Sequence, residues 1–253
     1  FNYKVERFAD IEILRYRVPD FESLSLKQKE LIYYLTQAAL EGRDILFDQN
    51  NRYNLLVRRT LETIYENYHG DKNSADFQSL TTYLKQVWMG NGIHHHYSED
   101  KFTPEFSKAF FADAIKSIDA EKFKNVLQTG ETVDNLIDKL NPIIFDPTVM
   151  PKRTNQAEGA DLIQTSSVNY YGEGITQAEV EAFYGTMKNP SDLRPISYGL
   201  NSKLVKEDGK ILEKVWKVGG MYSAAIERIV NWLEKAAGVS ENDKQKEVIT
   251  TLI

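Results

Sequence analysis

Four histidines are the main candidates for chemistry. The chain has no cysteine, so any general base or metal site must be built from His, Asp and Glu. His69 stands alone, whereas His94, His95 and His96 form a run. Successive side chains of an extended segment point to opposite faces, so His94 and His96 would share a face. No HExxH spacing, which sets two zinc-binding histidines one helical turn apart, occurs anywhere in the chain.

The histidine run is interpreted first as a loop that faces a substrate or packs against the fold. A solvated polar loop, and a small metal-dependent hydrolase that uses His94 and His96, stay open as alternatives. Gly90, Asn91 and Gly92 precede the run, and glycines adopt backbone angles that other residues resist. This stretch is therefore predicted to bend the chain between two helices, with a plain helix connector as the competing interpretation.

Other familiar catalytic patterns are missing. Ser166 and Ser167 are adjacent, but no GxSxG elbow surrounds them and no histidine lies near them in the sequence. The remaining glycines match neither a dinucleotide-binding fingerprint nor a P-loop. The sequence therefore assigns no catalytic residue and no metal ligand to this chain.

Composition and charge exclude several classes of protein. The chain carries 31 basic and 37 acidic side chains, a formal net charge of −6, and no dense run of Lys and Arg. Such a chain lacks the electrostatic footprint of a nucleic-acid-binding protein. No apolar run approaches the ~20 residues that a membrane span needs. Hydrophobic residues make up 42% of the chain, which is enough to predict a globular fold with a real core.

Helical periodicity dominates the chain. Apolar residues recur three and four positions apart in most segments, as expected for helices that bury one face. Thr176 with Glu179 is typical of a capping box at the start of one of them. Helices are predicted over residues 25–47, 53–68, 74–88, 104–115, 119–127, 132–140, 176–187, 221–237 and 241–253.

Three parts of the sequence are predicted to form strands: the opening residues, residues 163–171 and residues 200–218. Residues 200–218 form two β-rich arms around Asp208-Gly209, a pair that suits a tight hairpin turn. Residues 163–171 show the alternation and β-branching of a strand. Few strands among many helices predict a predominantly helical α+β fold with a small sheet. An internal division is placed near residues 141–160, and the sequence is expected to be part of a longer protein.

A family resemblance rests on stretches spread over nearly the whole chain. Residues Met89-Gly90-Asn91, His96-Tyr97 and Lys101-Phe102-Thr103-Pro104 look like the Met-Gly-Asn loop of the dipeptidyl peptidase III family. These zinc metallopeptidases release dipeptides from peptide N-termini. The other stretches that resemble the family are Phe21–Gln49, Ser167–Ala178 and Glu213–Ala225. The resemblance is greatest to the bacterial, Bacteroides-like branch of the family.

The resemblance implies that residues 1–253 are the N-terminal portion of a two-lobed peptidase, with N-terminal helices and a lobe bearing a small β-sheet or barrel. Asn91 would shape the bend, and His96 and Tyr97 would border the first residues of an oligopeptide substrate. The family's HExxGH motif is absent here. Zinc would therefore belong to the full-length protein and its C-terminal catalytic region, and this chain alone would bind none and be inactive.

Two further expectations complete this interpretation. The resemblance favours a cytoplasmic location, with an exported bacterial form as the alternative. The competing function is a non-enzymatic helical module that binds a peptide or protein.

Overall fold

The computed structural model describes all residues from Phe1 to Ile253, and the chain folds into two compact units. Unit 1 comprises Phe1–Arg7, Glu12–Leu46 and Ser197–Ile253. Unit 2 comprises Phe8–Ile11 and Phe47–Ile196. The predicted division near residues 141–160 thus falls inside unit 2, where this segment is hydrogen-bonded to residues 94–101. None of the helices has both the length and the apolar composition that crossing a bilayer would require.

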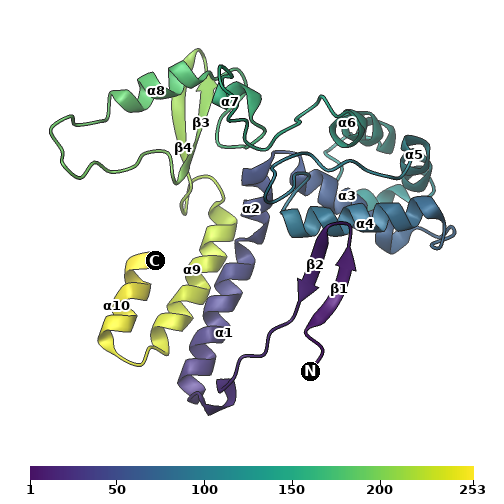
Figure 1. The fold of residues 1–253 in the computed structure, drawn as a ribbon. Helices are drawn as coiled ribbons and strands as arrows, with labels where there is room; N and C mark the ends of the chain where they lie inside the picture. Colours follow the sequence, from purple (N-terminus) through teal and green to yellow (C-terminus); the bar gives the residue numbers. More distant parts are fainter. The chain divides into compact units, whose positions relative to one another are not determined.

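Helices hold about half of the residues, so the fold is α+β and predominantly helical, as predicted (Figure 1). They are α1 (Leu26–Glu41), α2 (Arg43–Asn50), α3 (Asn54–Asn67), α4 (Ala75–Gly90), α5 (Lys108–Lys116), α6 (Val133–Phe145), α7 (Leu162–Thr165), α8 (Gln177–Gly185), α9 (Ser223–Gly238) and α10 (Asp243–Leu252). Two short 3-10 turns cover Phe21–Ser23 and Ala120–Phe123.

The strands form two separate two-stranded sheets. Strand β3 (Ser202–Glu207) pairs antiparallel with β4 (Lys210–Val215) around Asp208 and Gly209, which confirms the predicted hairpin. Both turn residues have positive φ angles, 49° and 74°, as this tight turn requires. The other sheet pairs β1 (Lys4–Phe8) with β2 (Ile11–Leu14). The sheet expected from the resemblance therefore takes the form of hairpins and not of a barrel, because two strands cannot close on themselves.

Three predicted helices have different limits in the structure. The helix expected over 25–47 is interrupted at Gly42, which caps α1. The helix expected from Pro104 begins only at Lys108, because the Ser107 hydroxyl accepts the Phe110 N–H and fixes the start there. Residues 119–127 form only a short 3-10 turn.

The strand predicted over 163–171 is wrong. The short helix α7 forms instead, because the Asp161 carboxylate accepts hydrogen bonds from the N–H groups of Ile163 and Gln164. The same carboxylate accepts the N–H of Gln177, a contact 16 positions away in the chain. This capping outweighs the β-branched composition of the segment.

Unit 1 has a small apolar core between long helices. Helices α1 and α9 lie side by side, and α10 packs on α9 (Figure 1). An ion pair of 2.6 Å between Arg228 Nε and Glu41 Oε2 joins the outer sides of α1 and α9. The buried apolar residues between these helices are Leu31, Ala38, Leu233, Ala236 and Ile249.

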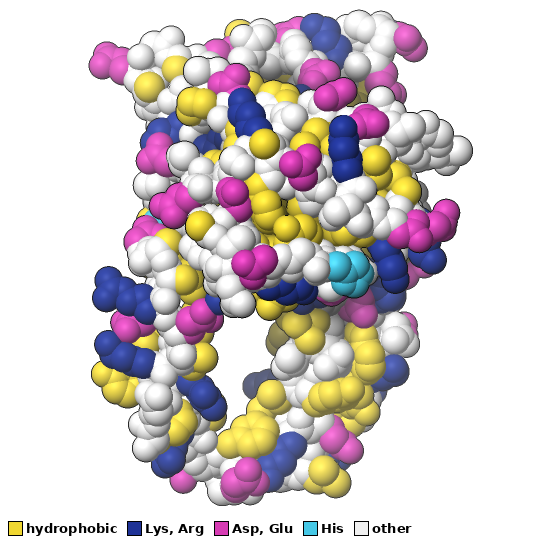
Figure 2. All heavy atoms as spheres, turned by 90° about the vertical axis from the view of Figure 1, so that its right-hand side faces the viewer, with side chains coloured by type: hydrophobic (Ala, Val, Ile, Leu, Met, Phe, Trp, Pro, Cys, Tyr) yellow, Lys and Arg dark blue, Asp and Glu magenta, His cyan; other side chains and the backbone are white.

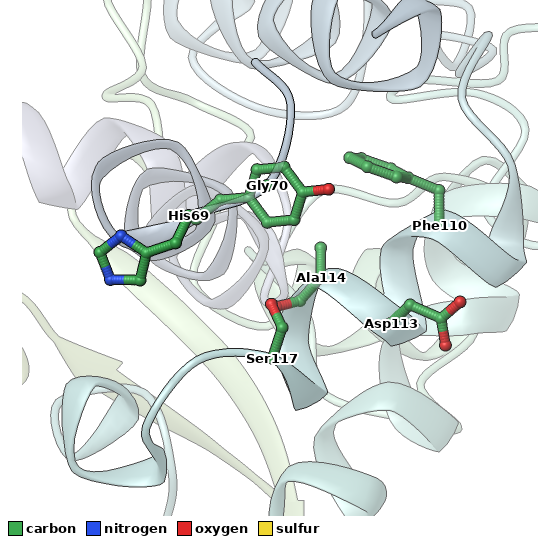
Figure 3. Close-up of a pocket in the computed structure, with 7 residues that line it drawn as sticks. His69, Gly70, Phe110, Asp113, Ala114 and Ser117 are labelled. Carbon is green, nitrogen blue, oxygen red and sulfur yellow. The ribbon is translucent and has the colours of Figure 1, made fainter.

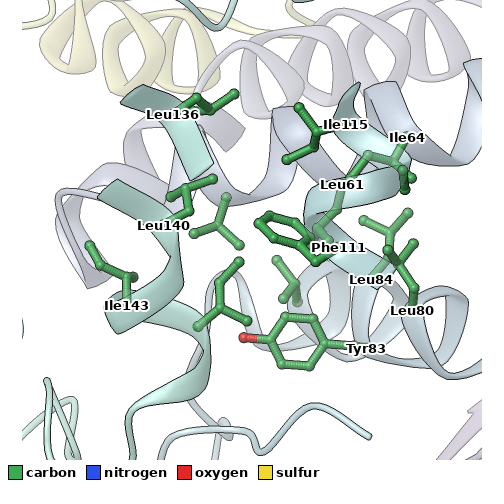
Figure 4. Packing of buried hydrophobic residues seen from close by; sticks show 14 of the residues in the cluster. Leu61, Ile64, Leu80, Tyr83, Leu84, Phe111, Ile115, Leu136, Leu140 and Ile143 are labelled. Carbon is green, nitrogen blue, oxygen red and sulfur yellow. The ribbon is translucent and has the colours of Figure 1, made fainter. Parts of the chain in front are cut away.

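Unit 2 contains the larger core, formed by apolar faces of α3, α4, α5 and α6 (Figure 4). Each of these helices presents residues three or four positions apart, which is the periodicity read from the sequence. The core members labelled in Figure 4 are Leu61, Ile64, Leu80, Tyr83, Leu84, Phe111, Ile115, Leu136, Leu140 and Ile143. These helices provide the rigid base from which the histidine segment departs.

Surface charge is mixed. On the face shown in Figure 2, Lys and Arg side chains alternate with Asp and Glu, and hydrophobic side chains lie between them. This face offers no continuous basic surface of the kind that a phosphate backbone requires.

Replacing Tyr83 by phenylalanine should stabilise unit 2. The Tyr83 side chain is buried, its hydroxyl has no hydrogen-bond partner, and burial raises the pKa of the phenol. Figure 4 shows the hydroxyl among apolar side chains. Removing an unpaired buried hydroxyl while keeping the ring should raise the free energy of unfolding by about 1 kcal/mol. Urea denaturation of both proteins measures this, and a less stable Tyr83→Phe protein would contradict the expectation.

Candidate functional site

The bend predicted from Gly90-Asn91-Gly92 is present at the end of α4. Asn91 caps the helix in the left-handed conformation, with φ 51° and ψ 42°. Gly92 follows with φ 143°, and its N–H donates to the Val87 carbonyl at 2.9 Å. This pattern closes the last helical turn and sends the chain away from the helix axis.

Two asparagines hold the bend, the partly buried Asn50 at the end of α2 and the buried Asn54 at the start of α3. Asn54 Nδ2 donates to the Asn91 carbonyl at 3.3 Å, and Asn54 Oδ1 accepts the Ile93 N–H at 3.1 Å. Asn50 Nδ2 donates to the same Asn91 carbonyl at 3.1 Å. Neither asparagine was predicted from the sequence, although a cluster of asparagines where helical periodicity breaks is a usable signal.

His94 lies in the interior, not on a surface. Its side chain is 2% exposed, and Nε2 lies 2.9 Å from the Met150 carbonyl oxygen. Because a carbonyl only accepts, Nε2 carries the proton and Nδ1 is a bare acceptor, which is buried without a partner. Burial lowers the pKa of His94 to about 4, so the ring is neutral at pH 7. His96 is exposed, so the expected shared face of His94 and His96 is not formed.

His95 uses both ring nitrogens. Nε2 lies 3.1 Å from Asp10 Oδ2, in the turn between β1 and β2. Nδ1 accepts the backbone N–H groups of Tyr97 and Ser98, each at 3.1 Å. The ring is therefore the neutral form with its proton on Nε2. It ties the loop both to the hairpin turn and to its own next residues.

His96 and Tyr97 form an exposed pair, which we call the aromatic tip. Tyr97 is 84% exposed, and its ring centroid lies 4.4 Å from that of His96. The His96 ring lies 4.5 Å from that of His95. The structure thus brings His96 and Tyr97 together at the surface, whereas Asn91 lies at the base of the loop, where its backbone shapes the bend.

Residues 146–153 hold the end of the loop that contains Glu99 and Lys101. Lys101 Nζ donates to the carbonyls of Asp146 and Val149, at 2.6 and 2.8 Å. Burial lowers the pKa of Lys101 to about 8. Arg153 pairs with Glu99 at 2.7 Å. Burial acts to raise the pKa of Glu99, but the hydrogen bonds from Arg153 and Thr154 outweigh it and hold that pKa below its usual value.

The described side chains do not fit a zinc site. No group of three or more His, Asp or Glu residues is arranged to hold a metal ion. In the histidine run, Nε2 of His94 faces a carbonyl and both nitrogens of His95 are engaged. The zinc implied by the family resemblance has no ligand set among these residues, and no chemical step is assigned to it here.

A separate shallow pocket of about 350 Å³ in unit 2 is lined by His69, Asp113 and Ser117, among others (Figure 3). The Ser117 hydroxyl donates to the Ala114 carbonyl at 2.8 Å. Figure 3 shows the His69 ring and the Asp113 carboxylate pointing to opposite sides. These side chains do not form the hydrogen-bonded series that activates a serine nucleophile.

Comparison with known proteins supports the fold. The structure is similar to a solved dipeptidyl peptidase III from Caldithrix abyssi, with a TM-score of 0.52 over 92% of this chain and 16% sequence identity. The chain spans 31% of the length of that protein. No family model and no curated protein sequence matches. The two units therefore have a fold similar to part of a dipeptidyl peptidase III.

Proposed function

We propose that this chain is the substrate-positioning portion of a zinc dipeptidyl peptidase of the dipeptidyl peptidase III type. The observation that carries the proposal is the similarity of fold, which extends over 92% of the chain. In the proposed division of labour another part of the full-length protein would hold zinc. Hydrolysis of the peptide bond then belongs to that part.

The aromatic tip is the proposed contact with the peptide. Its two rings lie on the surface, while the bend at Asn91 is held by Asn50 and by the buried Asn54. A rigid base with exposed aromatic side chains suits a site that packs on substrate side chains without reacting with them. Asn91 contributes by shaping the bend, and His96 and Tyr97 contribute the surface.

Replacing Tyr97 by alanine should weaken the use of substrate by the full-length protein. Loss of one aromatic contact of about 1–3 kcal/mol should lower kcat/KM for dipeptide release by roughly tenfold to a hundredfold, mainly through KM. Because Tyr97 is 84% exposed, stability should hardly change. Steady-state kinetics with a chromogenic dipeptide substrate measures the effect.

Two matched variants make that test specific. Tyr97→Phe keeps the ring and should retain most activity, and His69→Ala removes an exposed ring outside the loop and should be silent. An unchanged kcat/KM for Tyr97→Ala would remove the tip from the substrate site.

The competing function, a non-enzymatic binding module, gives a different result. A dipeptidyl peptidase requires that the full-length protein release dipeptides in a zinc-dependent way, whereas a binding module would bind peptides with no turnover. The chain alone should bind peptide weakly and release no dipeptide. Full-length protein that binds peptide but releases no dipeptide with zinc present would favour the module and overturn the proposal.

A further inference from the structure

The backbone of the aromatic tip is folded over the His95 ring. The His95 N–H donates to the Asp100 carbonyl at 2.8 Å, and the Glu99 N–H donates to the His95 carbonyl at 3.0 Å. Within this turn, the N–H groups of Tyr97 and Ser98 both point at Nδ1. The backbone N–H groups of Tyr97 and Ser98 therefore share one acceptor, Nδ1 of His95.

Protonation would remove that lone pair. An imidazolium ion carries hydrogen on both nitrogens and accepts no hydrogen bond. Nδ1–H would then face two other N–H groups at 3.1 Å, so two attractive contacts would become repulsive. Histidine is the side chain whose ordinary chemistry makes this change between pH 5 and 8.

At Nε2, on the opposite side of the ring, protonation would strengthen a contact instead of breaking one. Nε2–H donates to Asp10 in either protonation state, and a charged ring would strengthen this contact. The hydrogen bond from Lys152, whose Nζ lies 2.6 Å from Asp100 Oδ1, is the main cause that lowers the pKa of Asp100, and His95 makes a smaller contribution. The remaining neighbouring rings are those of His96, Tyr97 and Phe102. The Asp10 carboxylate thus favours a charged ring at Nε2, while the backbone amides of Tyr97 and Ser98 oppose it at Nδ1.

We propose that His95 is a protonation-controlled positioning residue for the aromatic tip. When neutral, His95 holds Tyr97 and Ser98 in the observed turn. When protonated, it releases them and stays attached to Asp10, so the tip loses its fixed direction while the base of the loop remains in place. The consequence for peptide binding rests on the proposed function, but the response of the loop to pH does not.

Hydrogen exchange measured by NMR on the chain without substrate tests the proposal. Protection factors of the Tyr97 and Ser98 amides should fall at least tenfold between about pH 7.5 and about pH 5. The Phe102 amide, which donates to the Ile93 carbonyl at 2.9 Å, serves as an internal reference and should change little. His94, with a pKa of about 4, titrates below this range.

Two substitutions separate the two nitrogens of the ring. His95→Asn keeps an acceptor near the position of Nδ1 and cannot titrate, so protection should persist at both pH values. His95→Gln keeps a donor toward Asp10 but offers no acceptor at Nδ1, so protection should be low at both. Equal protection of the wild-type amides at both pH values would overturn the proposal. So would a loss of protection in His95→Asn that matches the wild type.

These outcomes are independent of peptidase activity. A silent Tyr97→Ala substitution in kinetics would remove the substrate role and leave the exchange result intact. Failure of the exchange experiment would remove the protonation control and leave the role of Tyr97 untouched.

Discussion

Replacing Gly92 by alanine should lower the free energy of unfolding of unit 2 by roughly 3–5 kcal/mol. Gly92 has φ 143°, a conformation that side-chain-bearing residues rarely adopt. An added Cβ would also lie 2.0 Å from Asn54 Nδ2. Asn54 would have to move, and its hydrogen bonds to the Asn91 carbonyl and the Ile93 N–H would be lost. Urea denaturation followed by circular dichroism measures the effect.

Gly130→Ala is the matched control. Gly130 also has a positive φ, 80°, but a Cβ there would meet nothing within 4 Å. Its cost should be limited to backbone strain of about 1 kcal/mol. The difference between the two variants measures the contact with Asn54 together with the greater backbone strain at φ 143°, and equal losses would show that neither contributes.

Acidification from pH 6.5 to pH 4 should lower the free energy of unfolding by roughly 3 kcal/mol through His94 alone. The pKa of His94 is about 4 in the folded protein, against about 6.5 for an unperturbed histidine, and burial is the main cause. Between these values the unfolded chain binds more protons than the folded one, so stability decreases as the pH falls. Well above pH 6.5 the histidine is neutral in both states, and its effect on stability no longer changes with pH.

His94→Gln isolates this contribution. A glutamine amide can still donate to the Met150 carbonyl, which His94 Nε2 contacts at 2.9 Å, but it does not titrate. Carboxylates change stability in the same way in both proteins. The difference between the two pH profiles should therefore contain only the His94 step, and parallel profiles between pH 6.5 and pH 4 would contradict the assignment.

Local signals in the sequence were sufficient for most helices and for the β3–β4 hairpin. The capping box of Thr176 and Glu179 is present, because both of its hydrogen bonds lie within four residues. The strand predicted over 163–171 failed because its β-branched composition was weighted above the Asp161 cap. The Asp161 carboxylate that starts α7 also accepts the N–H of Gln177, a contact 16 positions away that no local pattern reveals.

In the candidate site, too, some features follow from the local sequence and others depend on distant residues. The bend at Asn91 follows from local backbone preferences, so the sequence located it. The burial of His94 depends on Met150, 56 positions away, and no property of the three consecutive histidines distinguishes the buried one from the exposed ones. The hold of Asn54 on the loop spans 37 positions and was equally hidden.

These long connections also bear on the order of events in folding. Contacts that close large loops cost chain entropy before they contribute stability, so they tend to form after local helical contacts. We expect the loop from Asn91 to Phe102 to gain order late, once α3 and α4 have already paired. Substitutions such as Asn54→Ala should then accelerate unfolding more than they slow folding. A newly made chain would complete its helical core first and its candidate peptide-contact surface last.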